Sequence, residues 1–83
     1  MDVKYFSWIR EGIGKGEESI DKPETVNTVA DFLDFLCARD GGYADVLKER
    51  VFVRVAVNQV HVNHTHELAD NDEIALFPPV TGG

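Results

Sequence analysis

The last seven residues are the part of the chain whose composition points most directly to chemistry. They read Phe77-Pro78-Pro79-Val80-Thr81-Gly82-Gly83. The prolines prevent a central strand from continuing, because proline has no backbone N–H to donate. Two final glycines give the narrowest and least restricted backbone a polypeptide can have, so this tail could enter a channel in another protein and present its carboxylate there. The alternative, which sequence physics alone favours, is an ordinary frayed terminus.

The segment before the tail, residues 73–77, is expected to form the final strand. If Ile74 and Leu76 face the core, Phe77 faces outward at the base of the tail. An exposed aromatic ring at that point would be a suitable anchor for a partner protein. The alternative is that Phe77 folds over the edge of the sheet and completes the core, because parity at strand ends slips easily.

Three histidines in the segment His-Val-Asn-His-Thr-His could suggest a metal site. Imidazole is a common metal ligand, but His64 and His66 share a face only if the segment is extended, and no cysteine lies near them or His61. We therefore favour a polar hairpin and predict no metal site.

Cys37 and the glycine-rich segment 12–16 are two further candidates. Cys37 could carry sulfur as a persulfide, but it follows Leu36 in the last turn of an amphipathic helix, so a small buried side chain is the favoured interpretation. Residues 12–16 lack the spacing and the Lys-Ser/Thr pair of a phosphate-binding loop, so we interpret them as a turn.

The composition limits the classes of function. The chain has 83 residues, 43% of them hydrophobic, which is enough for one compact unit. Its net charge of −7 argues against nucleic-acid binding and is compatible with a partner that has a basic surface. No apolar run approaches the ~20 residues of a membrane-spanning helix. The N-terminal residues do not resemble a signal peptide, and the single cysteine suits a reducing compartment, so we expect a cytoplasmic protein.

The elements that must position the tail can be read from the apolar patterns. Residues 3–9 are rich in β-formers and predict a strand, and residues 17–20 predict a second strand that returns as a hairpin. The clearest helix is expected over residues 29–39, with Thr28 as its N-cap and Asp31 completing a capping box. Gly41 and Gly42 are expected to stop it.

The second half of the chain predicts further strands. Residues 51–58 form the strongest strand pattern, with four valines on one face. A connector over residues 43–50 has possible helical turns, and a tight turn through Asn58 and Gln59 is expected to lead into a short strand at 60–62. One helix covering a small mixed sheet satisfies this order, so we predict an α+β fold of the β-grasp type. We expect residues 1–77 to form the domain and residues 78–83 a flexible tail.

The C-terminal residues also carry a resemblance to a known family. The ending Asp70-Asn71-Asp72-Glu73-Ile74-Ala75-Leu76-Phe77-Pro78-Pro79-Val80-Thr81-Gly82-Gly83 resembles that of the small subunits of molybdopterin synthase, as do residues 55–59 and the pair Arg10-Glu11. The similarity extends over the whole chain in length and element order. This family belongs with the sulfur carriers of thiamine synthesis and shares the ubiquitin-like β-grasp fold.

The resemblance implies a reaction cycle at Gly83. An ATP-dependent activating enzyme would adenylate its carboxylate, and sulfur from a separate donor would displace AMP and leave a thiocarboxylate. Thr81, Gly82 and Gly83 would enter the active site of the large synthase subunit, where the sulfur passes to cyclic pyranopterin monophosphate, in two transfers per molybdopterin. Phe77, Pro78, Pro79 and Val80 would form the partner interface. The chain itself would bind no cofactor, and ATP would be used by the activating enzyme.

Two other functions begin from the same acyl-adenylate. One is sulfur carriage for thiamine or tRNA thiolation, against which the Phe-Pro-Pro-Val-Thr stretch argues. The other is conjugation through Gly83 to lysines of other proteins, as a ubiquitin-like modifier. The resemblance further implies a heterotetramer with two large subunits at its centre.

Overall fold

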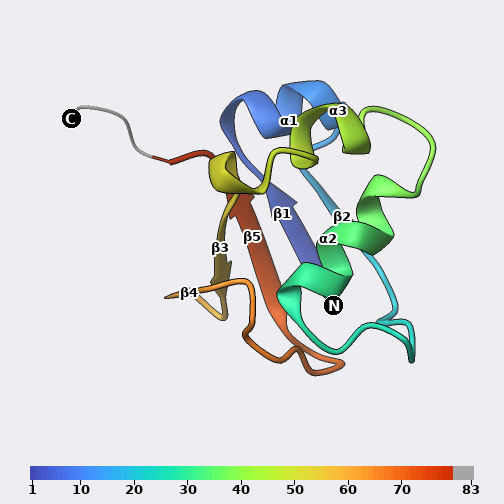
Figure 1. Cartoon of the computed structure of the whole chain (residues 1–83), viewed down its shortest axis with the longest axis vertical. Coiled ribbons are helices and arrows are strands. Elements are labelled where there is room, and N and C mark those ends of the chain that lie inside the picture. Colours follow the sequence, from blue (N-terminus) through green and yellow to red (C-terminus); the bar gives the residue numbers. More distant parts are fainter. Residues whose placement is uncertain (80–83) are drawn as a thin grey trace.

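Five strands form one mixed sheet within residues 1–79, the part of the chain that the computed structural model describes. In spatial order they are β2 (Glu17–Ser19), β1 (Asp2–Tyr5), β5 (Glu73–Phe77), β3 (Arg54–Val57) and β4 (Val60–Val62). β1 and β5 are parallel, and the other neighbouring pairs are antiparallel. The strand that leads to the C-terminal tail therefore lies in the middle of the sheet, between β1 and β3 (Figure 1).

The predicted main helix is confirmed as α2 (Val29–Cys37). The Thr28 side chain accepts a hydrogen bond from the Asp31 N–H, and the Asp31 carboxylate accepts one from the Thr28 N–H, which completes the capping box. The helix ends at Cys37, and Gly41 follows with a φ of 108°. The apolar stripe is fully buried, with exposures of 1% or less at Val29, Phe32, Leu33 and Leu36.

The core lies between α2 and one face of the sheet. Ile74 and Leu76 of β5 are both 0% exposed, and each residue of this kind stabilises the fold by about 1.5–3 kcal/mol relative to an exposed position. Asn58 and Gln59 have φ values of 52° and 69°, as a two-residue hairpin turn between β3 and β4 requires. The predicted α+β fold of the β-grasp type is confirmed.

The first predicted strand was too long. β1 ends at Tyr5, and the helix α1 (Ser7–Ile13) follows directly. Ser7, with a φ of 54°, turns the chain out of the strand. Ile9 and Ile13 are then buried at the four-residue spacing of one helix face, and this spacing outweighs the β-propensity of residues 6–9.

The glycine-rich segment is therefore only partly a turn. Gly12 lies in α1, and Gly14 ends that helix with a φ of 90°. α1 packs beside α3 (Tyr43–Leu47), which forms where helical turns were expected, and the two helices lie together at one end of the molecule (Figure 1). A Cβ on Gly42 would stand only 1.8 Å from the Gly12 carbonyl oxygen, so the close approach of the two segments requires glycine there.

The predicted strand over residues 51–58 begins later than expected. Residues Arg50–Phe52 form a 3-10 turn, η1, and β3 starts at Arg54. Val53, Val55 and Val57 are buried as the alternation predicted, but Val51 is 70% exposed. Within residues 1–79, no helix is long and apolar enough to cross a membrane.

Candidate functional site

The base of the tail lies at the end of the central strand. β5 ends at Phe77, and Pro78 and Pro79 are half-buried beyond it. The remaining predicted site residues, Val80, Thr81, Gly82 and Gly83, lie outside the described residues. The start of the tail is therefore described, and its predicted reactive end is not.

β5 holds this exit point in place through both neighbours. On one side Leu76 pairs with Tyr5 of β1, and its carbonyl oxygen accepts a hydrogen bond of 3.1 Å from the Phe6 N–H. On the other side Leu76 pairs with Val55 and Phe77 pairs with Arg54. A strand paired on both edges and buried at alternate residues is a rigid support, so the direction in which the chain leaves the domain is set by the fold.

Phe77 projects from the sheet face that lies away from the helices. Strand parity places it opposite to Ile74 and Leu76, and it is half-buried against the His61 ring of β4, with ring centroids 5.2 Å apart. The ring thus belongs to the outer face, and the alternative in which Phe77 completes the core is wrong.

Exposed apolar side chains surround the exit point. Phe6 is 45% exposed at the end of β1, and Phe52 is 52% exposed in η1. Both segments lie at the end of the sheet where β5 finishes, because β1 is parallel to β5 and η1 precedes the antiparallel strand β3 (Figure 1). We call Phe6, Val51, Phe52 and Phe77 the apolar rim. Sequence reasoning found only Phe77, because it placed Phe6 and Val51 inside strands.

Three ionisable groups with shifted pKa values, Tyr5, Glu18 and Tyr43, form a polar cluster at the β1–β2 hairpin. The Glu18 carboxylate accepts hydrogen bonds from the Tyr5 and Tyr43 hydroxyls at 2.7 and 2.5 Å, and Arg39 lies 3.2 Å from it. Burial opposes ionisation of Glu18, but the two hydroxyl donors and Arg39 outweigh it and lower the pKa of the carboxyl group. Burial, and then the hydrogen bond to Glu18, raise the pKa of Tyr5. The cluster joins the β1–β2 hairpin to α3 and to the segment after α2.

The histidines take separate positions. The His64 Nε2 atom lies 2.9 Å from the Val53 carbonyl oxygen, His61 packs on Phe77, and His66 is exposed. Within residues 1–79, no group of three or more His, Cys, Asp or Glu side chains is placed to hold a metal ion.

Cys37 is half-buried against the core, and its Sγ atom lies 3.7 Å from Arg50 Nη2. It is thus less enclosed than the sequence suggested.

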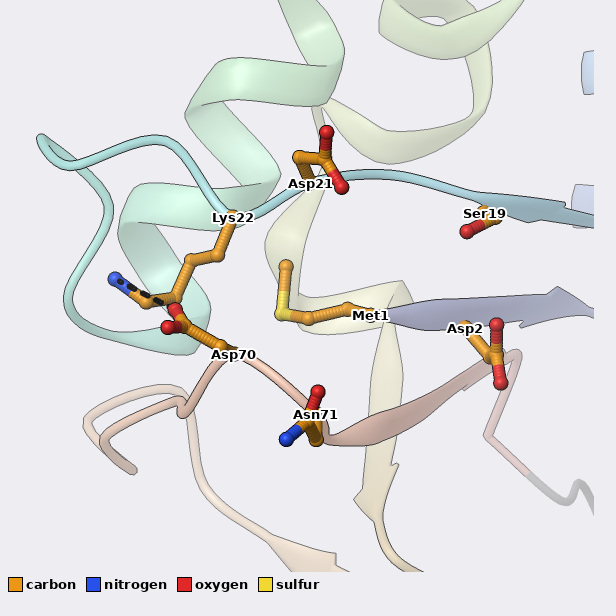
Figure 2. Close-up of a pocket in the computed structure, with 7 residues that line it drawn as sticks. All are labelled: Met1, Asp2, Ser19, Asp21, Lys22, Asp70 and Asn71. Carbon is orange, nitrogen blue, oxygen red and sulfur yellow. Dashed lines mark ion pairs between the residues drawn. The ribbon is translucent and has the colours of Figure 1, made fainter.

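A wide polar cavity of about 670 Å³ lies at the other end of the sheet. Figure 2 shows the side chains that line it, and they come from the start of β1, from the end of β2 with the loop after it, and from the turn before β5. Lys22 and Asp70 form an ion pair of 4.0 Å across it. Because β5 runs from this end toward Phe77, the cavity and the exit point are separated by the length of the strand.

Comparison with known proteins shows what the whole chain is similar to. Residues 3–83 match the ThiS family. The molybdopterin synthase sulfur carrier subunit of Escherichia coli (strain K12) is 37% identical over 85 residues, which cover 100% of this chain and 99% of that protein.

Two solved structures have the same fold at similar identity. One, from Pyrococcus furiosus, is assigned to subunit 1 of molybdopterin converting factor; it is 34% identical, with a TM-score of 0.77 and 95% of each chain covered. The other is small archaeal modifier protein 1 of Haloferax volcanii, 31% identical, with a TM-score of 0.71 and again 95% of each chain covered. Since the family match runs from residue 3 to residue 83 and the bacterial relative is similar over its full length, this chain belongs to the ThiS family.

Proposed function

We propose that this chain is the sulfur-carrier subunit of a molybdopterin synthase and that Gly83 is its reactive residue. The observation that carries the proposal is the position of Phe77, Pro78 and Pro79, which end the central β-grasp strand beside an apolar rim and precede the Gly-Gly end in the sequence. Full-length similarity to a protein named as a molybdopterin synthase sulfur carrier subunit supports it.

The proposed chemistry explains why the chain needs no catalytic side chain of its own. A carboxylate is a poor acyl donor, because oxide would have to leave. Attack of the Gly83 carboxylate on ATP releases pyrophosphate and forms an acyl-adenylate, from which sulfide displaces AMP. The product is a thiocarboxylate, an anion at neutral pH whose soft sulfur is nucleophilic without a general base.

The sulfur acceptor in this proposal is cyclic pyranopterin monophosphate. Two transfers build the dithiolene of molybdopterin. In each, the thiocarboxylate sulfur bonds to a carbon of the acceptor, and water then cleaves the acyl carbon–sulfur bond and returns the tail as a carboxylate. The charges that develop during transfer would be stabilised by lysines or arginines of the large subunit. The chain holds no cofactor in this scheme, and ATP is consumed by a separate activating enzyme.

The apolar rim is the surface through which we propose that the chain contacts its large subunit. Aromatic rings at the surface, here the exposed Phe6 and Phe52 and the half-buried Phe77, are the residue type that anchors protein interfaces. Docking at this surface would bring the tail to the partner's active site, because the tail follows the end of β5 and the apolar rim surrounds that end. The assembly would operate in the cytoplasm.

A ubiquitin-like modifier is the second candidate. The similarity to small archaeal modifier protein 1 favours it, since a modifier would also use an activated terminal glycine. Isopeptide-linked Gly83 on cellular proteins would distinguish conjugation from sulfur carriage.

Reconstitution tests the proposal. The thiocarboxylated chain is mixed with the large synthase subunit and cyclic pyranopterin monophosphate, and molybdopterin is assayed. The matched control is the same chain with an ordinary carboxylate. Product from the thiocarboxylate alone supports the proposal, and equal yields from both forms, or none from either, would refute it.

A further inference from the structure

The sheet face away from the helices has a charge distribution that the net charge of −7 does not suggest. Alternation along the strands places Lys4, Ala75 and Phe77 on this face, and with them Asp2 and Glu73, each two residues away on the same strand. The residues paired to this set across the sheet share the face, among them Glu17, Arg54, Ala56 and His61. Its acidic side chains, Asp2, Glu17 and Glu73, all lie on β1, β2 and the start of β5. On β3 and β4 the face instead presents Arg54 and His61.

Arg54 is the cation nearest to the exit point on this face. It stands directly opposite Phe77 in the β3–β5 register, where paired Cβ atoms lie about 4.5–5.5 Å apart. Its side chain is exposed and, among the described residues, has no carboxylate within ion-pair distance. Lys4, by contrast, is paired with Glu73 at 3.6 Å.

A hollow of about 320 Å³ opens beside this arginine. Its lining includes Arg54, His61 and Asn63, so donors surround a space large enough for a short side chain. The Phe77 ring lies against His61, one of the residues that line the hollow, and pairs with Arg54 in the strand register, so it provides an apolar neighbour. A guanidinium with an apolar ring at its side suits a carboxylate carried next to an apolar residue, because its planar fork binds both oxygens at once.

We infer that Arg54, with His61 and Asn63 beside it, binds a carboxylate side chain of the large subunit when that subunit docks on the apolar rim. The inference rests on the proposed function and specifies the chemistry of the partner surface. The partner would be basic where it faces the acidic remainder of the chain and acidic where it meets β3 and β4. Such alternation fixes the orientation of docking, because a rotated arrangement would place like charges together.

Charge reversal with a matched control tests this inference. The full-length chain is titrated with the large synthase subunit of the same organism by calorimetry, as wild type, Arg54→Glu, Arg54→Gln and Lys48→Glu. Lys48 is exposed at the end of α3 and does not belong to the sheet face that carries Arg54, so its reversal makes the same change in net charge without altering that face. Thermal unfolding of each variant checks the fold. If Arg54→Glu does not fold, the comparison of Arg54→Gln with wild type tests the inference.

The expected result is that Arg54→Glu raises the dissociation constant at least ~10-fold and Arg54→Gln raises it by a smaller factor, while Lys48→Glu changes it less than ~2-fold. A partner variant with one interfacial carboxylate changed to lysine should restore binding to Arg54→Glu. Equal effects of the two reversals, or no effect of either, would overturn the inference while leaving the proposed function intact. Failure of the wild-type chain to bind would refute the proposed complex and the inference with it.

Discussion

The His61 imidazole packs against the Phe77 ring with centroids 5.2 Å apart, on the sheet face that the helices do not cover. Strand parity places Phe77, the last aromatic residue of the sequence, on this side of the sheet, and the contact with His61 supports it there. Phe77 is held by a neighbour on β4 and is not part of the core, so it can contact another protein without unfolding its own domain.

Truncation of this ring should weaken docking. We expect Phe77→Ala to reduce the free energy of binding to the large subunit by about 1–3 kcal/mol, because an aromatic anchor would be lost. Val60→Ala is the control, since Val60 is an exposed apolar residue (63%) at the opposite end of the sheet. An unchanged dissociation constant for Phe77→Ala, or a collapsed fold, would argue against the anchor.

Cys37 is expected to have no part in sulfur transfer. It is half-buried on α2, and we propose that sulfur travels on Gly83. Cys37→Ala should therefore retain full activity in the reconstituted assay. Loss of activity at unchanged thermal stability would instead indicate a persulfide at this position.

The Glu18 cluster should make stability depend on pH at both ends of the range. The pKa of Glu18 is lowered in the folded protein. Its contribution to the free energy of unfolding is therefore present above the ordinary pKa of about 4.5 and is lost as the pH falls through the lowered pKa. The pKa values of Tyr5 and Tyr43 are raised, so their contribution is present below about 10 and is lost as the pH rises further.

The variant Glu18→Gln should reduce the free energy of unfolding at pH 7 by about 1–3 kcal/mol, because two hydroxyls lose a charged acceptor. It should also flatten both limbs of the pH profile, measured by urea unfolding. The acid limb should persist in part, since the pKa of Asp31 is lowered by backbone hydrogen bonds from Asn27 and Thr28. A profile identical to wild type would contradict a stabilising role for Glu18.

The contact between α1 and the segment before α3 should not tolerate a side chain. We expect Gly42→Ala to lower the free energy of unfolding by about 1–3 kcal/mol, because the added Cβ would meet the Gly12 carbonyl oxygen. At Gly16 the nearest neighbour is the flexible Arg10 side chain at 3.1 Å, so Gly16→Ala is the matched control. Equal stability of the two variants would show that the helices can separate without cost.

The parts of the fold that could be predicted are those with regular apolar spacing. The stripe from Val29 to Leu36 and the alternation around Ile74 and Leu76 each report burial against one surface, and both predictions are confirmed. The prediction of a strand over residues 6–9 is wrong, because the helical spacing of Ile9 and Ile13 outweighs the β-propensity of these residues.

The apolar rim was harder to predict for a different reason. Val51 and Phe52 continue the valine pattern of β3, and only the 3-10 turn at Arg50–Phe52 takes them out of the strand and leaves them exposed. Whether apolar residues in a turn are exposed depends on tertiary contacts, so a strand pattern in the sequence cannot predict it. The opposition of Arg54 and Phe77 likewise follows from the β3–β5 register, which the sequence did not specify.

The central claim is that sulfur is carried on the terminal carbonyl group of Gly83. The most direct test is intact-protein mass spectrometry of the chain after incubation with its activating enzyme, ATP and a sulfur donor, with the chain lacking Gly83 as the control. We predict a gain of about 16 mass units, one oxygen replaced by sulfur, located on Gly83 in the full chain and absent from the truncated one. No gain in mass, or the same gain in the truncated chain, would contradict it.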